Sequence, residues 1–239
     1  MHQHRIIVTS VSALLAFVAS SCGVGVDMAF RADRSAALAL SVEVPQPVEA
    51  KLRQFAATDS RPAMFDAAAI AASVAARGIA VRESVSPDGR SWRGAFTIAD
   101  IEKLLAVDKD LASVLSFNRG PGWASIRLRV DRSNALALTR LFPGLDGQLL
   151  EALQPPALYD NPVNSQEYRT MLSGLLGKAA VAALDGAALK LTASFPGTIL
   201  ESSGSVRVDA ARKTVSLAFP AIDVMVLEQP IVFFVQWKE

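Results

Sequence analysis

Apolar and polar residues alternate over much of this chain, with the period of two that is typical of half-buried β-strands. Residues 24–44 contain two such runs around a turn candidate, and they are therefore expected to form a β-hairpin. Two more hairpins are expected over residues 79–98 and 111–130, with turns at residues 87–89 and 119–122. The pattern predicts that antiparallel hairpins make up much of the fold.

Apolar residues at helical spacing separate these hairpins. Shorter helices are expected from Pro47 onward, over residues 65–77 and 100–106, and over residues 145–153. The strongest helical pattern covers residues 165–184, where apolar side chains recur at i, i+3 and i+4. This longest segment is expected to bury one face against the rest of the protein.

Asn164 and Glu167 stand three residues apart at the start of the longest helix and fit a capping box, in which each side chain bonds the backbone of the other residue. Capping explains these two residues more simply than a polar site that would include Tyr168 and Arg169. We therefore predict an α+β fold, in which antiparallel β-hairpins and sheets pack against several helices, including one long amphipathic helix near residues 165–184.

The chain after residue 188 is rich in strand patterns and closes with Ile231–Trp237, a run that is apolar on both faces. A bilayer-spanning helix needs about 20 apolar residues, so this run is too short to be one. It is instead expected to be a central strand covered on both sides.

The most loop-like segment is residues 155–164, which contains three prolines and two asparagines. Residues 22–239 are expected to form a single α+β domain, or two subdomains divided near that segment. Residues 33–40 and 131–138 agree at seven of eight positions, 98 residues apart. A true repeat would imply similar halves. The second copy, however, continues into a pattern typical of a helix capped by Ser133, so coincidence is favoured over duplication.

The first 21 residues carry the parts of an export signal: Arg5 near the start, a short apolar run, and the small residues Ala19, Ser20 and Ser21. The only cysteine of the chain, Cys22, follows directly. This arrangement resembles the lipobox of bacterial lipoproteins, although Ala19 stands where leucine is commonest. The resemblance implies removal of residues 1–21 and a diacylglyceryl group on Cys22. The alternative is an ordinary secreted protein with one stray cysteine.

Removal of residues 1–21 would leave 218 of the 239 residues, with 23 basic and 23 acidic side chains. Such a balanced chain with no basic run argues against binding of nucleic acid, which depends on neutralised phosphates. Both histidines, His2 and His4, lie in the removed segment. Histidine-dependent catalysis and the usual histidine and cysteine metal ligands are therefore absent from the remainder, and we expect no cofactor, no metal site and no enzymatic activity.

Other candidate side chains have simpler structural explanations. Arg127, Arg129 and Arg207 alternate out of predicted strands and could contact an acidic partner or lipid headgroups, but a solvated sheet face is the simpler interpretation. Asp108 and Asp110 flank a lysine on a loop, and nothing marks them as an acid/base pair. Residues 202–204 lack a histidine partner and the glycine spacing of a nucleophile elbow.

Several short motifs together resemble a family of uncharacterised bacterial envelope lipoproteins and, more distantly, the LppM-type domain. The motifs are Val26-Asp27 with Phe30, Leu141-Phe142-Pro143-Gly144, Pro155-Pro156-Ala157-Leu158, Glu167-Tyr168-Arg169, and Leu227 to Ile231 before Trp237. The resemblance implies an α+β domain similar in fold to lipid-binding proteins, and it assigns no ligand residues.

These features predict a lipid-anchored lipoprotein of the bacterial cell envelope, on its periplasmic or surface face, that acts as a binding or structural module. The membrane would be its partner through the modified Cys22. An apolar ligand could occupy a cavity between the 165–184 helix and the sheet, or an envelope protein could bind. The alternative is an envelope enzyme with a carboxylate- or lysine-based site.

Overall fold

The computed structural model describes residues 23–56, 63–141, 151, 153–158, 163–203 and 205–239. Its strands are β1 (Gly23–Phe30), β2 (Ala36–Glu43), β3 (Ala80–Val85), β4 (Ser91–Ile98), β5 (Leu115–Gly120), β6 (Trp123–Val130), β7 (Ala188–Ser194), β8 (Ile199–Ser202), β9 (Arg207–Val208), β10 (Thr214–Pro220) and β11 (Ile231–Lys238). Its helices are α1 (Gln46–Ala56), α2 (Ala67–Ala76), α3 (Ile101–Val107), α4 (Lys109–Val114), α5 (Ala135–Leu141), the 3-10 turn η1 (Pro156–Leu158), α7 (Ser165–Leu176), α8 (Lys178–Asp185) and α9 (Ala221–Val226).

The strands form two sheets. The larger sheet has the order β3-β4-β2-β1-β7-β10-β9 and the smaller one β5-β6-β11-β8. Strands β1 and β7 are parallel, whereas the other pairings in both sheets are antiparallel. Helices accompany both sheets, so the predicted α+β class is confirmed.

The first core lies between the two sheets. The register of the larger sheet places Val26 opposite Leu40 and Leu191, so one face of this sheet is apolar across its central strands. Buried side chains from β1, β7 and β10 meet buried side chains from β6 and β11, among them Phe233 and Val235. Helices α3, α4 and α5 close this core on one side.

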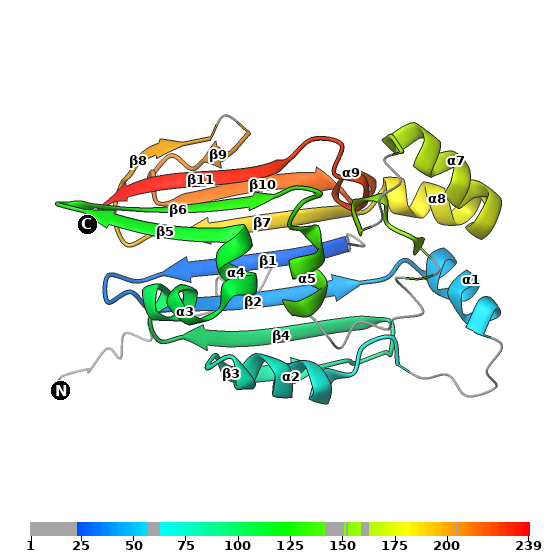
Figure 1. Ribbon diagram of the computed structural model, residues 1–239, viewed down its shortest axis with the longest axis horizontal. Helices are drawn as coiled ribbons and strands as arrows, with labels where there is room; N and C mark the ends of the chain where they lie inside the picture. Colours follow the sequence, from blue (N-terminus) through cyan, green and yellow to red (C-terminus); the bar gives the residue numbers. More distant parts are fainter. Residues whose placement is uncertain (1–22, 57–62, 142–150, 152, 159–162, 204) are drawn as a thin grey trace, which may run out of the picture.

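The second core lies at one end of the molecule, where α1, α7, α8 and α9 gather (Figure 1); we call this the helical end. Tyr168, Leu172 and Leu176 of α7 are almost completely buried there. They pack with Val48 of α1 and Ile222 of α9. The same cluster continues under α2, which covers β3 and β4.

The three predicted hairpins are present as β1–β2, β3–β4 and β5–β6. The third is shorter than expected, because residues 111–114 belong to α4 and not to a strand. The Asp108 side chain accepts a hydrogen bond from Leu111 N at 3.0 Å and caps that helix. The helix expected over residues 145–153 falls largely outside the described residues.

The longest predicted helix is two helices. Gly177 has a φ of 85°, which an α-helix cannot contain and which glycine adopts without a steric penalty, so α7 ends there and α8 begins. The predicted capping box is confirmed: Glu167 N donates to Asn164 at 2.9 Å, and Asn164 N donates to Glu167 at 3.0 Å.

The two similar octapeptides have different structures. Residues 36–40 of the first copy are in strand β2, whereas residues 135–138 of the second are in helix α5. What they share is the turn before them, in which an aspartate accepts bonds from the serine two residues later: Asp33 from Ser35, and Asp131 from Ser133. Ser133 is therefore part of this turn, and the expectation that it caps the helix is wrong.

Strands from both sides of residues 155–164 share each sheet, since β1 pairs with β7 and β6 pairs with β11. The closing strand β11 is central in the smaller sheet, as predicted. Its burial is one-sided, however: Ile231, Phe233, Val235 and Trp237 are buried, whereas the alternate residues are partly exposed. Arg127 covers one of these, with its guanidinium 4.8 Å from the ring centre of Phe234.

Candidate functional site

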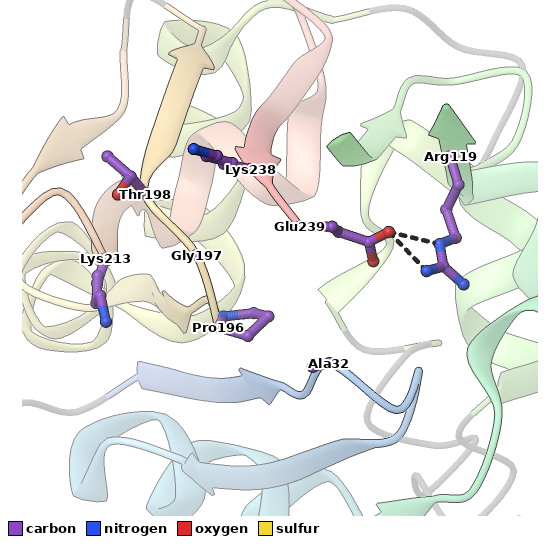
Figure 2. A pocket seen from close by; sticks show the side chains of 8 residues that line it. All are labelled: Ala32, Arg119, Pro196, Gly197, Thr198, Lys213, Lys238 and Glu239. Atoms are coloured by element: carbon purple, nitrogen blue, oxygen red, sulfur yellow. Dashed lines mark hydrogen bonds and ion pairs between the residues drawn. The ribbon is translucent and has the colours of Figure 1, made fainter. Parts of the chain in front are cut away.

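A surface cleft lies at the end of the molecule opposite the helical end. Four chain connections and the end of β11 meet there: the turn after β1, the tip of the β5–β6 hairpin, the β7–β8 loop and the β9–β10 turn. The lining residues, drawn in Figure 2, are Ala32, Arg119, Pro196, Gly197, Thr198, Lys213, Lys238 and Glu239. We call this site the cationic cleft. Its volume of about 540 Å³ lies within the range of small-molecule sites.

Three of the lining side chains are cationic and one is anionic. Arg119 Nε and Nη2 both donate to the same oxygen of Glu239, at 2.8 Å and 2.6 Å. Neither ammonium group, of Lys213 or of Lys238, forms an ion pair or side-chain hydrogen bond within the part of the chain that the structure describes. The cleft therefore presents two unpaired positive charges and one paired one.

The Arg119–Glu239 pair stands out electrostatically. The hydrogen bonds to Glu239 raise the pKa of Arg119 above its ordinary value, against an opposing effect of burial. Asp100 and Glu102 contribute more weakly in the same direction. Both of these carboxylates also form ion pairs with Arg34, at 3.7 Å and 3.3 Å. The Arg119 guanidinium is charged at any ordinary pH, and Glu239 is the carboxylate that pairs with it.

A cluster of aromatic rings supports the cleft from the core. Phe30, Phe117, Phe195 and Trp237 contact one another, with ring centres 4.7 to 5.9 Å apart for the pairs that include Trp237. Each ring comes one or two residues before a residue of the cleft, as Trp237 precedes Lys238 and Phe195 precedes Pro196. The rings therefore hold the loops that carry the charged side chains.

Gly197 fixes the approach of two of these loops. A Cβ at this position would lie 1.7 Å from the carbonyl oxygen of Lys238, a distance no side chain permits. Close by, Lys238 N donates to Thr198 O at 2.9 Å. The glycine thus allows the β7–β8 loop to lie against the end of β11, and it places Lys238 beside Thr198.

β1 starts at the helical end, whereas β11 ends at the other end of the protein (Figure 1), where its last residues line the cleft. Gly23 pairs with Glu43 and Ala188, next to the points where β2 leads to α1 and α8 leads to β7. Phe30, at the other end of β1, lies two residues before Ala32 of the cleft. The eight residues of β1 span about 25 Å, so Gly23 and Phe30 lie about that far apart.

Cys22 lies outside the described residues, but its neighbour Gly23 is placed. Gly23 has a φ of 145°, and a Cβ there would lie 2.2 Å from Ala188 O, so only glycine fits this close β1–β7 contact. A modified Cys22 would therefore attach its lipid at the helical end. The predicted lipidation itself stays a prediction.

The interface between the 165–184 segment and the sheet, where an apolar ligand was expected, holds side chains packed on one another. Tyr168 and Leu172 are fully buried, and the Tyr168 hydroxyl donates to Leu153 O at 2.7 Å. Burial raises the pKa of Tyr168 above its ordinary value, since the ionised phenolate would be poorly solvated there. An apolar ligand at this interface stays a prediction.

Most of the other candidate residues have structural partners. Arg129 pairs with Asp131 at 3.0 Å, while Arg207 lies exposed on the two-residue strand β9. Arg77 pairs with Asp108 at 2.6 Å and approaches Asp110 at 3.9 Å, which links α2 to α4. Desolvation alone would raise the pKa of Asp108, but the bonds from Leu111 and Arg77 outweigh it and lower that pKa. These contacts explain the side chains without a site.

No pattern in the sequence singles out the residues of the cationic cleft. Arg119 appeared only as part of a turn, and Lys213, Lys238 and Glu239 were not singled out. They meet because β5, β6 and β11 are neighbours in one sheet while β7 runs parallel to β1 in the other. For most of these residues, the local signal is a large aromatic residue one or two positions earlier in the chain.

The described residues contain no group of three or more histidine, cysteine, aspartate or glutamate side chains that could hold a metal ion. Among the same residues, no helix is long and apolar enough to cross a membrane. The molecule is thus an α+β protein of two sheets with a charged cleft at one end.

No protein-family model matches the chain, and neither does any curated protein sequence. Among solved structures, it is similar to the NMR structure of the folded domain of LppM from Mycobacterium tuberculosis, with 13% sequence identity, a TM-score of 0.40 and coverage of 91% of each chain. This weak likeness agrees with the distant LppM-like resemblance predicted from the sequence. No functional argument rests on it.

Proposed function

We propose that this chain is a lipid-anchored binding module of the bacterial cell envelope. Its helical end lies at the membrane, and its cationic cleft binds a polar ligand. The observation that carries the proposal is the position of β1, whose first residue follows Cys22 and whose last residue lies near the cleft. One strand thus links the anchor to the site.

This arrangement supports a ligand taken from the aqueous compartment. With the lipid on Cys22, the helical end would face the bilayer and the cleft would stand about 25 Å from it, the length of β1. The unpaired Lys213 and Lys238 favour a polar, negatively charged ligand over an apolar one. No catalytic role is proposed.

Anchoring is tested by metabolic labelling with a fatty acid that carries a clickable alkyne, followed by membrane fractionation. The full chain should incorporate label and sediment with membranes, and Cys22→Ala should do neither. Ser21→Ala is the matched control, because it keeps a small residue before the cysteine and should be processed normally. A Cys22→Ala chain that still fractionates with membranes would contradict the proposal.

A further inference from the structure

We infer that the cationic cleft binds an anion and that Glu239 of the same chain pairs with Arg119 when no ligand is bound. A soluble ligand with two phosphate groups displaces this carboxylate from Arg119. The inference rests on the proposed function and adds the ligand class and the means of occupancy. It starts from the two kinds of cation in the cleft, one paired and two unpaired.

The three cations surround the cleft instead of sharing one point. In Figure 2, Arg119 lies on one side, Lys213 lies on the other, and Lys238 lies between them near Thr198. A ligand with two phosphate groups carries acceptor oxygens for more than one of these cations, because each phosphate accepts charge-assisted hydrogen bonds from a lysine or arginine.

Glu239 holds Arg119 in the way that a ligand carboxylate or phosphate would. Its carboxylate takes two N–H donors of the guanidinium through one oxygen and leaves the other oxygen outside this contact. The Arg119 side chain stays 35% exposed, so a ligand in the cleft can reach it. An incoming phosphate offers more acceptor oxygens and more charge than Glu239 and therefore competes for the same donors.

The neutral and acidic neighbours of these cations do little to oppose an anion. Ala32, Pro196 and Gly197 offer no charge, so they leave room without adding preference. Asp100 and Glu102 act on Arg119 but are paired with Arg34, which limits their repulsion of an anion. The cleft lining has three cations against one carboxylate, and displacement of Glu239 from Arg119 makes all three available.

The test uses isothermal titration of the full chain, as purified from cells in a non-ionic detergent, with inorganic pyrophosphate as the probe. Saturable binding is expected that weakens as salt rises. Lys213→Ala and Lys238→Ala should each lower the affinity by about five- to tenfold, which corresponds to the loss of one charge-assisted contact. Lys178→Ala, the same change at the helical end, should leave it unaltered.

The Glu239→Gln variant shows whether Glu239 competes with the ligand for Arg119 or only stabilises the fold. If Glu239 competes with the ligand, this variant should bind pyrophosphate about three- to tenfold more tightly, because Arg119 becomes available. Glu83→Gln, which removes a carboxylate from the exposed pair with Arg93, is the matched control and should have no effect. Unchanged or weaker binding by Glu239→Gln would overturn the displacement.

A competition experiment distinguishes a soluble phosphate ligand from a lipid headgroup. Vesicles of phosphatidylcholine with phosphatidylglycerol should not compete with pyrophosphate, because the ligand is soluble. Competition that depends on Lys213, or the absence of any pyrophosphate binding at millimolar concentration, would overturn the inference. A failure of Cys22 lipidation would leave this titration unchanged, so the two proposals fail separately.

Discussion

The helical end and the cleft end of the molecule share the larger sheet but differ in their packing and in their charged side chains. The helical end is a dry core, where α7 buries Tyr168, Leu172 and Leu176 and a capping box fixes the start of the helix. The cleft end has a core of aromatic rings packed on one another, beneath charged side chains, two of which have no partner among the described residues. The difference agrees with the proposal that the helical end lies at the membrane and the cleft end binds a ligand.

The strongest way to break this comparison is to remove the ring beneath the cleft. Trp237 is 1% exposed and contacts Phe30, Phe117 and Phe195, so Trp237→Ala should lower the free energy of unfolding by about 3–5 kcal/mol. Urea denaturation followed by far-UV circular dichroism measures the loss.

Trp237→Phe is the matched control for that change. The Trp237 Nε1 has no hydrogen-bond partner in the described chain, so phenylalanine loses no such bond and should cost far less than alanine. A Trp237→Ala chain as stable as the unaltered one would show that the aromatic cluster does not support the cleft end.

A pair of glycine substitutions sharpens the comparison, because the two ends should respond with opposite signs. Gly197→Ala places a methyl group against Lys238 O and should cost about 1–3 kcal/mol of stability. Gly174→Ala, inside α7 with nothing within 4 Å of the new methyl group, should add about 0.5–1 kcal/mol. Thermal and urea unfolding of both variants measure the two shifts, and equal signs would contradict the placement of one of the glycines.

A small effect is also expected from loss of the hydroxyl at the helical end. Tyr168→Phe removes the bond to Leu153 O and should cost about 0.5–1.5 kcal/mol near neutral pH. Since burial raises the pKa of Tyr168 above 10.0, the folded protein keeps this proton when the unfolded chain releases it. Its stabilisation is therefore complete below about pH 10 and falls as the pH rises further.

Urea midpoints measured between pH 8 and 11 test this pH dependence. The difference between the unaltered chain and Tyr168→Phe should shrink as the pH rises above 10, because only the former loses stability through this group. A constant difference across the range would mean that Tyr168 is solvated and that the helical end is not dry.

The strands could largely be predicted because each hairpin is a local event. Alternation along residues 24–44 was enough to place β1 and β2, and the capping box at Asn164 was visible as a short motif. The octapeptides at residues 33–40 and 131–138 show the limit of such signals. Their sequences are nearly the same, but β2 lies between two strands while α5 packs on α4, so the neighbours decide.

The cleft could not be predicted for a related reason. Arg119 and Glu239 are separated by 120 residues and meet only after β11 has entered the sheet beside β6. The break at Gly177 was also hidden, because the apolar spacing continues through it and only the backbone dihedral reveals it. Contacts between distant segments and positive φ values leave little trace in a hydrophobic pattern.

The most direct test of the account is the distance of each end from the bilayer. Cys22 is the only cysteine of the chain, so once lipid occupies it, an introduced cysteine is the sole free thiol. Thr198→Cys at the cleft and Gln46→Cys at the start of α1 would each carry a fluorophore on the chain reconstituted in vesicles with spin-labelled lipid. Strong quenching at residue 46 and little at residue 198 is the predicted result, whereas equal quenching at both would contradict it.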